Sequence, residues 1–240
     1  MTGTLFVIGI GPGDPELMTL KAVRVLERVP CIIVPKGREE GASLALSIVR
    51  KELNLDGKEI VEAYFPMRKT RGDTAENPEL DEKWSETAES ILARLDRGID
   101  AAFITIGDPA IYSTFFYLYD RLLTARPELK IEIVPGISSI NASAARAGIS
   151  LGLGNERIAV LPANYLESLP DTLERFDTVV LMKVNKVFPE VRDVLAGMRL
   201  AGGAVYVARA GMDDERIVRD ITQVREEDLN YFSLVIVRKK

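Results

Sequence analysis

Short runs rich in Val, Ile and Phe alternate along this chain with longer segments in which apolar residues recur at helical spacing. This alternation is typical of folds with largely parallel sheets, because a crossover segment must carry the chain back between parallel strands. It therefore predicts the α/β fold class before any single motif is considered. The runs with the length and composition of strands are 5–10, 31–34, 60–65, 101–106, 131–134, 158–161, 178–182, 205–208 and 232–237.

Helices are expected in most of the segments between these strands. The segment 15–28 illustrates the pattern, since Leu17, Leu20 and Val23 recur at helical spacing. Pro15 stands near its start, where a missing N–H is tolerated. Similar amphipathic patterns predict helices at 43–53, 81–95, 112–123 and 189–200.

The length of the chain, 240 residues, lies between one large domain and two small ones, and a hydrophobic content of 47% is enough for a substantial core. We expect two α/β domains, at 1–114 and 115–240. The charged segment 66–80 lacks hydrophobic periodicity and contains Gly72 and Pro78, which predicts a long loop. Loops of this length are usually functional lids or disordered connections, and the sequence leaves both interpretations open.

Composition disfavours several classes of protein. The chain contains no histidine, so the usual general base and the commonest transition-metal ligand are missing, and no metal site is expected. The single cysteine, Cys31, lies in an apolar run and is expected to be a small buried residue. A formal net charge of −5 disfavours a nucleic-acid surface. The apolar run 5–10 is too short to span a membrane and has no basic leader, so we expect a cytoplasmic protein.

The first glycine-rich corner, Gly9 to Asp14, lies between a predicted strand and a predicted helix. Glycines there permit a tight turn and close approach of the backbone to a ligand. A dinucleotide-binding fingerprint would require glycine at the position of Asp14, and Pro12 removes a backbone donor. The second strand also ends in Val34-Pro-Lys36 without an acidic residue to bind a ribose, so a nicotinamide-dependent dehydrogenase is disfavoured. No phosphate-binding P-loop sequence occurs in the chain.

Two further corners, Ile106 to Ser113 and Val134 to Ser139, follow apolar strands at the ends where ligands bind in open α/β sheets. In the second corner, Gly107 permits close backbone approach, but Asp108 and its following proline could simply start a helix. In the third corner, the two serines could cap the next helix or offer hydroxyls to a ligand. Taken singly, each corner leaves these alternatives open.

Taken together and in this order, the corners resemble the class III, or tetrapyrrole, methyltransferases. The hallmark motifs of that family look like Gly-x-Gly-Pro-Gly-Asp-Pro, then Gly-Asp-Pro-x-x-Tyr-Ser, then a Pro-Gly-Ile-Ser-Ser run, and the likeness spans nearly the whole chain. Finer features look like the branch that methylates precorrin-2 or cobalt-factor II at C20 in cobalamin biosynthesis. These features are Val34 to Lys36 with Ser43 downstream, the loop before Trp84, and the run from Tyr112 to Tyr117.

The resemblance implies two α/β domains with a cleft between them, a homodimer, and S-adenosyl-L-methionine as the cofactor. The cofactor contacts that it implies are Pro12, Ile106, Gly107, Asp108, Ile111, Ser138, Ser139 and Met182. Looser candidates, which could instead serve only in sheet packing, come from two late strand ends: Ala210, Gly211, Ser233 and Leu234.

The resemblance also implies that the methyl acceptor is an electron-rich ring carbon of a reduced tetrapyrrole, from which a proton must leave after methylation. Because histidine is absent, Asp14 is the first candidate for a catalytic proton acceptor and Tyr112 the second. Asp14 could instead cap the helix that Pro15 begins. Candidate contacts for the substrate's carboxylates follow predicted strand ends and could also be ordinary rim charges: Lys36, Lys183 and Arg209.

Two alternatives of function remain. One is another enzyme of the same family, which would methylate a different corrin carbon, a diphthamide precursor or ribosomal RNA, although the low basic content disfavours RNA. The other is a non-catalytic cofactor-binding subunit that keeps the fold and has lost turnover.

Overall fold

The computed structural model describes residues 2–37, 42–64, 78–164 and 166–239. The chain divides into two compact units, Met1–Ser138 and Ser139–Lys240, called here the N-terminal and C-terminal units. Most of the long loop expected at 66–80 lies outside the described residues. Both units are α/β, as the alternating pattern predicts.

The N-terminal unit is built on a five-stranded sheet in the order β3-β2-β4-β1-β5. All of its described strand pairs are parallel. The strands are β1 (Leu5–Gly9), β2 (Cys31–Lys36), β3 (Glu59–Tyr64), β4 (Ala101–Thr105) and β5 (Ile131–Val134). The helices are the short 3-10 helix η1 (Pro15–Leu17), then α1 (Leu20–Arg28), α2 (Leu44–Glu52), α3 (Pro78–Leu95) and α4 (Phe115–Ala125).

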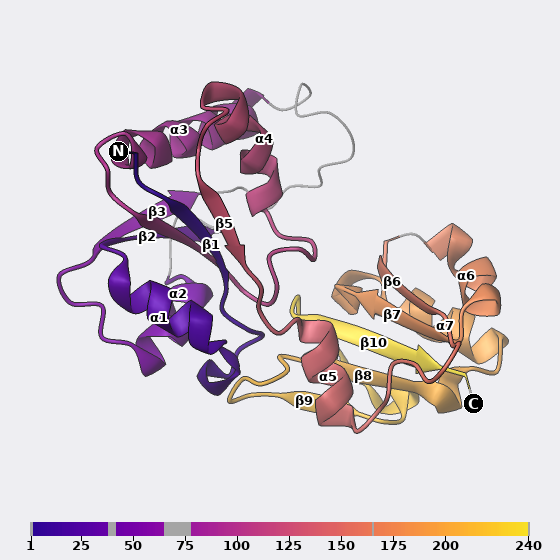
Figure 1. Ribbon diagram of the computed structural model, residues 1–240. Coiled ribbons are helices and arrows are strands. Elements are labelled where there is room, and N and C mark those ends of the chain that lie inside the picture. Colours follow the sequence, from indigo (N-terminus) through magenta and orange to yellow (C-terminus); the bar gives the residue numbers. More distant parts are fainter. Residues whose placement is uncertain (1, 38–41, 65–77, 165, 240) are drawn as a thin grey trace. The chain divides into compact units, whose positions relative to one another are not determined.

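Helices cover both faces of this sheet, with α1 and α2 on one face and α3 and α4 on the other (Figure 1). Because both faces are covered, the central strands read as continuous apolar runs, and every residue of β1 and β4 is buried. Cys31 is buried in the layer between the sheet and α3, which confirms its expected role as a small core residue. Burial raises the pKa of its thiol to about 11.

The expected helix at 15–28 is divided in the structure, because two separate caps interrupt it. The carboxylate of Asp14 accepts a hydrogen bond from the Glu16 N–H at 2.9 Å and caps η1. Thr19 then caps α1 by accepting from the Ala22 N–H at 3.1 Å. Leu20, expected on the apolar face, is 72% exposed as a result.

The expected helix at 112–123 begins three residues later, at Phe115. Tyr112 has a φ of 53°, in the left-handed region, which a residue of a right-handed α-helix cannot adopt. Asp108 therefore opens an irregular turn, and the interpretation of this corner as a simple helix start is wrong.

The boundary between the units lies between Ser138 and Ser139, whereas the sequence pattern places it between residues 114 and 115. β5 pairs in parallel with β1, with Leu5 opposite Ile131, so it completes the N-terminal sheet. The apolar face of α4 is buried in the core of the same unit. A boundary at residue 114 would remove both elements from the unit that they stabilise.

The C-terminal unit contains a mixed five-stranded sheet in the order β6-β7-β10-β8-β9. Only β6 and β7 pair in parallel, while β10 is antiparallel to β7 and β8, and β9 is antiparallel to β8. The expectation of largely parallel strands therefore holds for the first sheet only. The strands are β6 (Ile158–Pro162), β7 (Thr178–Met182), β8 (Ala204–Ala208), β9 (Arg216–Val218) and β10 (Ser233–Arg238).

Helices α6 (Leu169–Arg175) and α7 (Phe188–Gly197) bury their apolar faces against this sheet, and α5 (Ser139–Ala147) contacts β8 (Figure 1). The unit also contains the 3-10 helices η3 (Leu166–Ser168), η4 (Val184–Lys186), η5 (Ala201–Gly203), η6 (Ile221–Gln223) and η7 (Glu226–Asp228). The fully buried Tyr206 of β8 donates from its hydroxyl to the Asp228 carbonyl oxygen at 2.7 Å and ties η7 to the sheet.

In the part of the chain that the structure describes, no helix combines the length and the apolar character needed to cross a membrane.

Candidate functional site

The three glycine corners of the N-terminal unit lie together at one edge of its sheet. β5, β1 and β4 are neighbours and parallel, so their carboxyl ends open onto the same edge. Between the first two corners, the Gly107 N–H donates to the Gly11 carbonyl oxygen at 2.7 Å. Asp108 joins the second corner to the third, because its carboxylate accepts from the Gly136 N–H at 3.0 Å.

Backbone packing explains why two of the corner positions are glycine. A Cβ atom on Gly9 would lie 2.7 Å from the Gly107 oxygen and from the Gly136 nitrogen. A Cβ atom on Gly136 would collide with the Gly107 oxygen and with the backbone of Gly9. These glycines therefore allow the corners to pack on one another, a requirement separate from any approach to a ligand.

The predicted residues of the first and second corners differ in exposure. Pro12 is buried at its corner, while the carboxylate of Asp14 is partly exposed. In the second corner, Ile111 and Tyr112 are exposed, and Tyr112 retains 50% of its accessible surface. The other carboxylate oxygen of Asp108 accepts from the Ala110 N–H at 2.7 Å, so both of its oxygens fix backbone of the corners.

The third corner ends at the boundary between the units. Ser138 is buried and is the last residue of the N-terminal unit, whereas Ser139 is the first residue of α5 in the C-terminal unit. The expected helix after this corner is thus present.

In the C-terminal unit, the late strand ends meet at one edge of the mixed sheet. Because β10 runs antiparallel to β7 and β8, its first residues lie beside the last residues of both neighbours. Leu234 is opposite Met182, and the Lys183 N–H donates to the Ser233 carbonyl oxygen at 2.8 Å. On the other side, the Arg209 N–H donates to the Phe232 carbonyl oxygen at 2.7 Å. The predicted residues of this unit beyond Ser139 therefore form one group, composed of Met182, Lys183, Arg209, Ala210, Gly211, Ser233 and Leu234.

Backbone strain marks three of the predicted site residues. Among the described non-glycine residues, positive φ angles occur at Tyr112, Lys183, Arg199 and Arg209. Arg199 follows the carboxyl end of α7, where such a conformation is a common way to end a helix. The other three, with φ of 52° to 59°, stand at corners next to predicted contacts. Strained backbone is often found at ligand sites, where the surrounding structure maintains it, so these angles favour a functional role for Tyr112 in the N-terminal unit and for Lys183 and Arg209 in the C-terminal unit.

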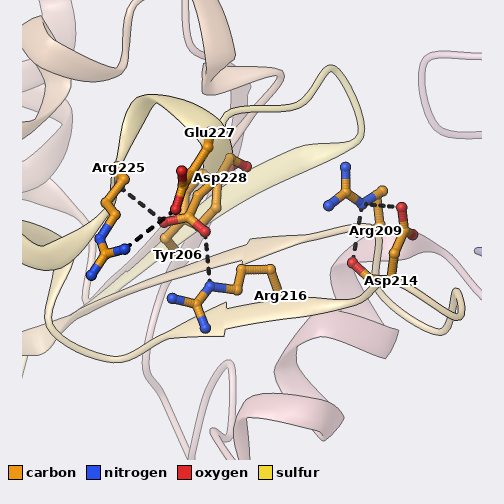
Figure 2. Close-up of polar contacts among 7 residues, drawn as sticks. All are labelled: Tyr206, Arg209, Asp214, Arg216, Arg225, Glu227 and Asp228. Carbon is orange, nitrogen blue, oxygen red and sulfur yellow. Dashed lines mark hydrogen bonds and ion pairs between the residues drawn. The ribbon is translucent and has the colours of Figure 1, made fainter.

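Each predicted substrate cation has a partner within the protein. The Lys36 ammonium lies 2.9 Å from the Glu62 carboxylate, with its side chain only 10% exposed. The Lys183 ammonium lies 5.6 Å from the centre of the Tyr231 ring. Arg209 contacts Asp214 twice, from Nε to the carboxylate at 3.0 Å and to the carbonyl oxygen at 3.1 Å (Figure 2). A substrate carboxylate would have to share these cations with their present partners.

One polar residue at the C-terminal edge has no signal in the sequence pattern. The Glu215 carboxylate accepts from the Gly211 N–H at 2.7 Å and from the Arg146 guanidinium at 2.8 Å. Burial raises the pKa of this carboxyl, but the hydrogen bonds from Arg146 and Gly211 outweigh burial and leave the pKa below its usual value. Glu215 lies in an acidic turn that reads as ordinary surface, so only the fold shows its role.

A cavity of about 280 Å³ lies elsewhere in the N-terminal unit, between β3 and α3. Its lining includes Val61, Ala63, Lys83 and Thr87, and it contains no predicted site residue. We therefore locate the candidate site from the corners and strand ends. Groups of three or more metal-binding side chains are absent from the described residues.

Residues 4–224 match the family of Tetrapyrrole (Corrin/Porphyrin) Methylases, and the chain belongs to this family. The resemblance carried by the three corners is thereby confirmed, and the cofactor is S-adenosylmethionine. The residues present fit such a cofactor, because small-molecule sites combine apolar side chains with a few polar groups, and the corners offer both in the exposed Ile111 and the Ser138 hydroxyl.

Curated relatives match over the full length of the chain. The cobalt-precorrin-2 C(20)-methyltransferase of Salmonella typhimurium is 35% identical, with 100% of this chain and 98% of the relative covered. The precorrin-2 C(20)-methyltransferase of a Sinorhizobium species is 31% identical, with 98% of this chain and 95% of the relative covered.

Solved structures share the fold. The X-ray structure of a cobalt precorrin-4 methyltransferase has a TM-score of 0.75 at 22% identity and covers 98% of this chain and 94% of its own. The uroporphyrin-III C-methyl transferase from Thermus thermophilus, in complex with S-adenyl homocysteine, has a TM-score of 0.68 at 20% identity. It covers 99% of this chain and 98% of its own.

Proposed function

We propose that this protein transfers a methyl group from S-adenosylmethionine to C20 of precorrin-2 or of its cobalt-loaded counterpart, in cobalamin biosynthesis. The observation that carries the proposal is the full-length similarity to C20-methyltransferases, at 35% identity with 100% of the chain covered. A relative from Methanocaldococcus jannaschii, named as a probable cobalt-precorrin-2 C(20)-methyltransferase, is also 35% identical over 98% of the chain.

We assign the cofactor contacts to both units. In the N-terminal unit they come from the first two corners and from the end of the third. Asp108 fixes the backbone of the second and third corners. In the C-terminal unit they come from Ser139 and from the strand-end group around Met182 and Gly211. The full set is Pro12, Ile106, Gly107, Asp108, Ile111, Ser138, Ser139, Met182, Ala210, Gly211, Ser233 and Leu234.

S-adenosylmethionine supplies a methyl group on a positively charged sulfur, so the reaction is an in-line displacement that needs no metal and no protein nucleophile. The protein contributes alignment and a preorganised environment, and the packed corners suit that purpose because their backbone has little freedom to move. A new carbon–carbon bond forms at the acceptor carbon, the carbon–sulfur bond breaks, and S-adenosylhomocysteine leaves.

The proton released from the methylated carbon needs an acceptor. We assign this role to Asp14, with Tyr112 as the second candidate. The hydrogen bond that Asp14 accepts from the Glu16 N–H leaves further acceptor capacity on the carboxylate. Asp14→Asn keeps the cap through its amide oxygen and removes the base, so it separates the two roles of this residue.

The polycarboxylate substrate needs cations, and we assign Lys36, Lys183 and Arg209 to it. Lys183 and Arg209 occupy strained positions at the same strand-end edge, which supports the assignment. Charge reversal at either residue should raise KM for the tetrapyrrole far more than it changes the affinity for the cofactor.

Isothermal titration with S-adenosylhomocysteine tests the cofactor half of the proposal, and a folded protein that does not bind it would overturn that half. Incubation with a precorrin-2-type substrate and methyl-labelled cofactor tests the other half. We expect the label at C20, and label on any other carbon rejects the C20 assignment. A comparison of the turnover rates on metal-free and on cobalt-loaded substrate identifies the natural form of the substrate.

We also propose, from the family resemblance, that the protein is a homodimer in the cytoplasm. A molar mass of about twice 26.5 kDa by light scattering is expected. Fractionation of cells that express the protein tests its location.

A further inference from the structure

The segment between β8 and β9, from Arg209 to Glu215, has a defined internal structure. Arg209 and Gly211 have positive φ angles of 52° and 77°. The Met212 N–H donates to the Arg209 carbonyl oxygen at 2.9 Å, and the Glu215 N–H donates to that of Met212 at 3.1 Å. Two consecutive turns thus present the backbone of Ala210 and Gly211 at the strand-end edge.

Two neighbouring carboxylates hold these turns. Asp214 contacts Arg209, the first residue of the segment (Figure 2). Glu215 reaches back to the Gly211 N–H, which donates at 2.7 Å. The Glu215 side chain is only 12% exposed, so this hydrogen bond is largely shielded from water.

Glu215 also reaches a second element. Its two carboxylate oxygens accept from Nε of Arg146 at 2.8 and 3.0 Å, and Arg146 lies in the last turn of α5. α5 begins at Ser139, itself a proposed cofactor contact, and packs against β8. One carboxylate therefore connects the helix that carries Ser139 with the turn that carries Gly211.

We infer that Glu215 is a positioning residue for cofactor binding, which fixes the Ala210–Gly211 backbone against α5 without touching the cofactor itself. The inference rests on the proposed assignment of Ala210 and Gly211 as cofactor contacts. Because the carboxylate is charged and accepts from both partners, it holds this backbone more firmly than a neutral acceptor would. The entropic cost of ordering this turn is then incurred when the protein folds, so it does not reduce the affinity for the cofactor.

The test compares four variants by isothermal titration with S-adenosylhomocysteine. Glu215→Ala removes the acceptor of both donors and should weaken binding by about tenfold. Glu215→Gln keeps a neutral oxygen for the Gly211 N–H, and Arg146→Met keeps the carboxylate, so each should weaken binding by only about two- to threefold. In turnover, Glu215→Ala should raise KM for S-adenosylmethionine and leave kcat at saturation within about twofold of the parent protein.

Asp177→Ala is the matched control. Asp177 also accepts from backbone, at 2.7 Å from the Arg157 nitrogen, and it pairs with the guanidinium of the same residue. It precedes β7 and therefore lies at the opposite end of that strand from Met182. This variant should bind S-adenosylhomocysteine as the parent protein does, with a comparable loss of thermal stability.

Equal affinity of Glu215→Ala and the parent protein overturns the inference, as does equal weakening in the Asp177 control. If Glu215→Ala does not fold, parent-like affinity of both Glu215→Gln and Arg146→Met overturns it. A parent protein that binds no S-adenosylhomocysteine contradicts the proposed function, whereas binding by the parent with no effect of these variants contradicts the positioning role alone.

Discussion

At the scale of single residues, the glycines of the corners have a role that motif matching does not show. The motifs themselves predict places where backbone can approach a ligand. In the structure, Gly9 and Gly136 have no room for a side chain because the backbone of another corner occupies the space. Loss of one of these glycines should therefore destabilise the fold as well as alter the site.

Gly136→Ala should lower the free energy of unfolding by at least about 2 kcal/mol, since its Cβ would collide with the Gly107 oxygen and the corners would have to separate. Urea unfolding measures the change. Gly197→Ala is the control, because Gly197 is in α7 and a Cβ there meets no atom within 4 Å. The control should be neutral or up to about 1 kcal/mol more stable. Equal stability of Gly136→Ala and the parent protein would contradict the account of the packed corners.

At the scale of elements, the buried Asp228 at the end of η7 connects this helix with β9 of the C-terminal sheet. Asp228 accepts from the Arg225 N–H at 2.9 Å and from Nε of Arg216 at 2.8 Å (Figure 2). The hydrogen bond from the Arg225 N–H, with further help from Arg216 and against burial, holds the pKa of this carboxyl below its usual value. The ionised form is thus favoured in the folded state.

A carboxyl whose pKa is lower in the folded than in the unfolded state stabilises the fold at pH values above its unfolded-state pKa, which is about 4 for aspartate. This stabilisation is lost as the pH falls below about 4 and the carboxylate becomes protonated. Asp228→Asn should therefore be less stable than the parent at pH 7 and should lose less stability between about pH 5 and pH 3. Arg216→Met should flatten the same pH profile to a smaller extent. Thermal unfolding followed across this range measures both effects, and parallel profiles of Asp228→Asn and the parent would refute the role of Asp228.

At the scale of the whole molecule, the division of the chain follows sheet membership. α4 and β5 come after the second corner, where the sequence pattern places a boundary, but their partners are in the first unit. Without urea, a fragment of residues 1–138 should show intact secondary structure by circular dichroism, and in urea it should unfold cooperatively. A fragment of residues 1–114 should not, because β1 loses its partner β5 and the core loses Phe115, Leu118 and Leu122. Equally cooperative unfolding of the two fragments would show that α4 and β5 do not stabilise the N-terminal unit and would contradict the boundary between residues 138 and 139.

The sequence alone predicts the α/β class, most of the helices and every described strand except β9, because strands in the core of a covered sheet are continuous apolar runs. The corners, taken in order, also indicated the family through their resemblance to its hallmark motifs. The sequence could not predict the short strand β9 or the antiparallel direction of β10, because both depend on partner strands that are distant in the chain.

The tertiary structure decided how the predicted residues are grouped. Asp108 joins two corners through the Gly136 N–H, and β10 brings Met182, Arg209 and Ser233 to one edge. It also placed Glu215 between two hydrogen-bond donors, Arg146 and the Gly211 N–H, that are 65 positions apart in the sequence. Local sequence encodes strand, helix and turn preferences through short-range sterics and hydrophobic period, whereas contacts between distant residues exist only once the sheet has set the register of its strands.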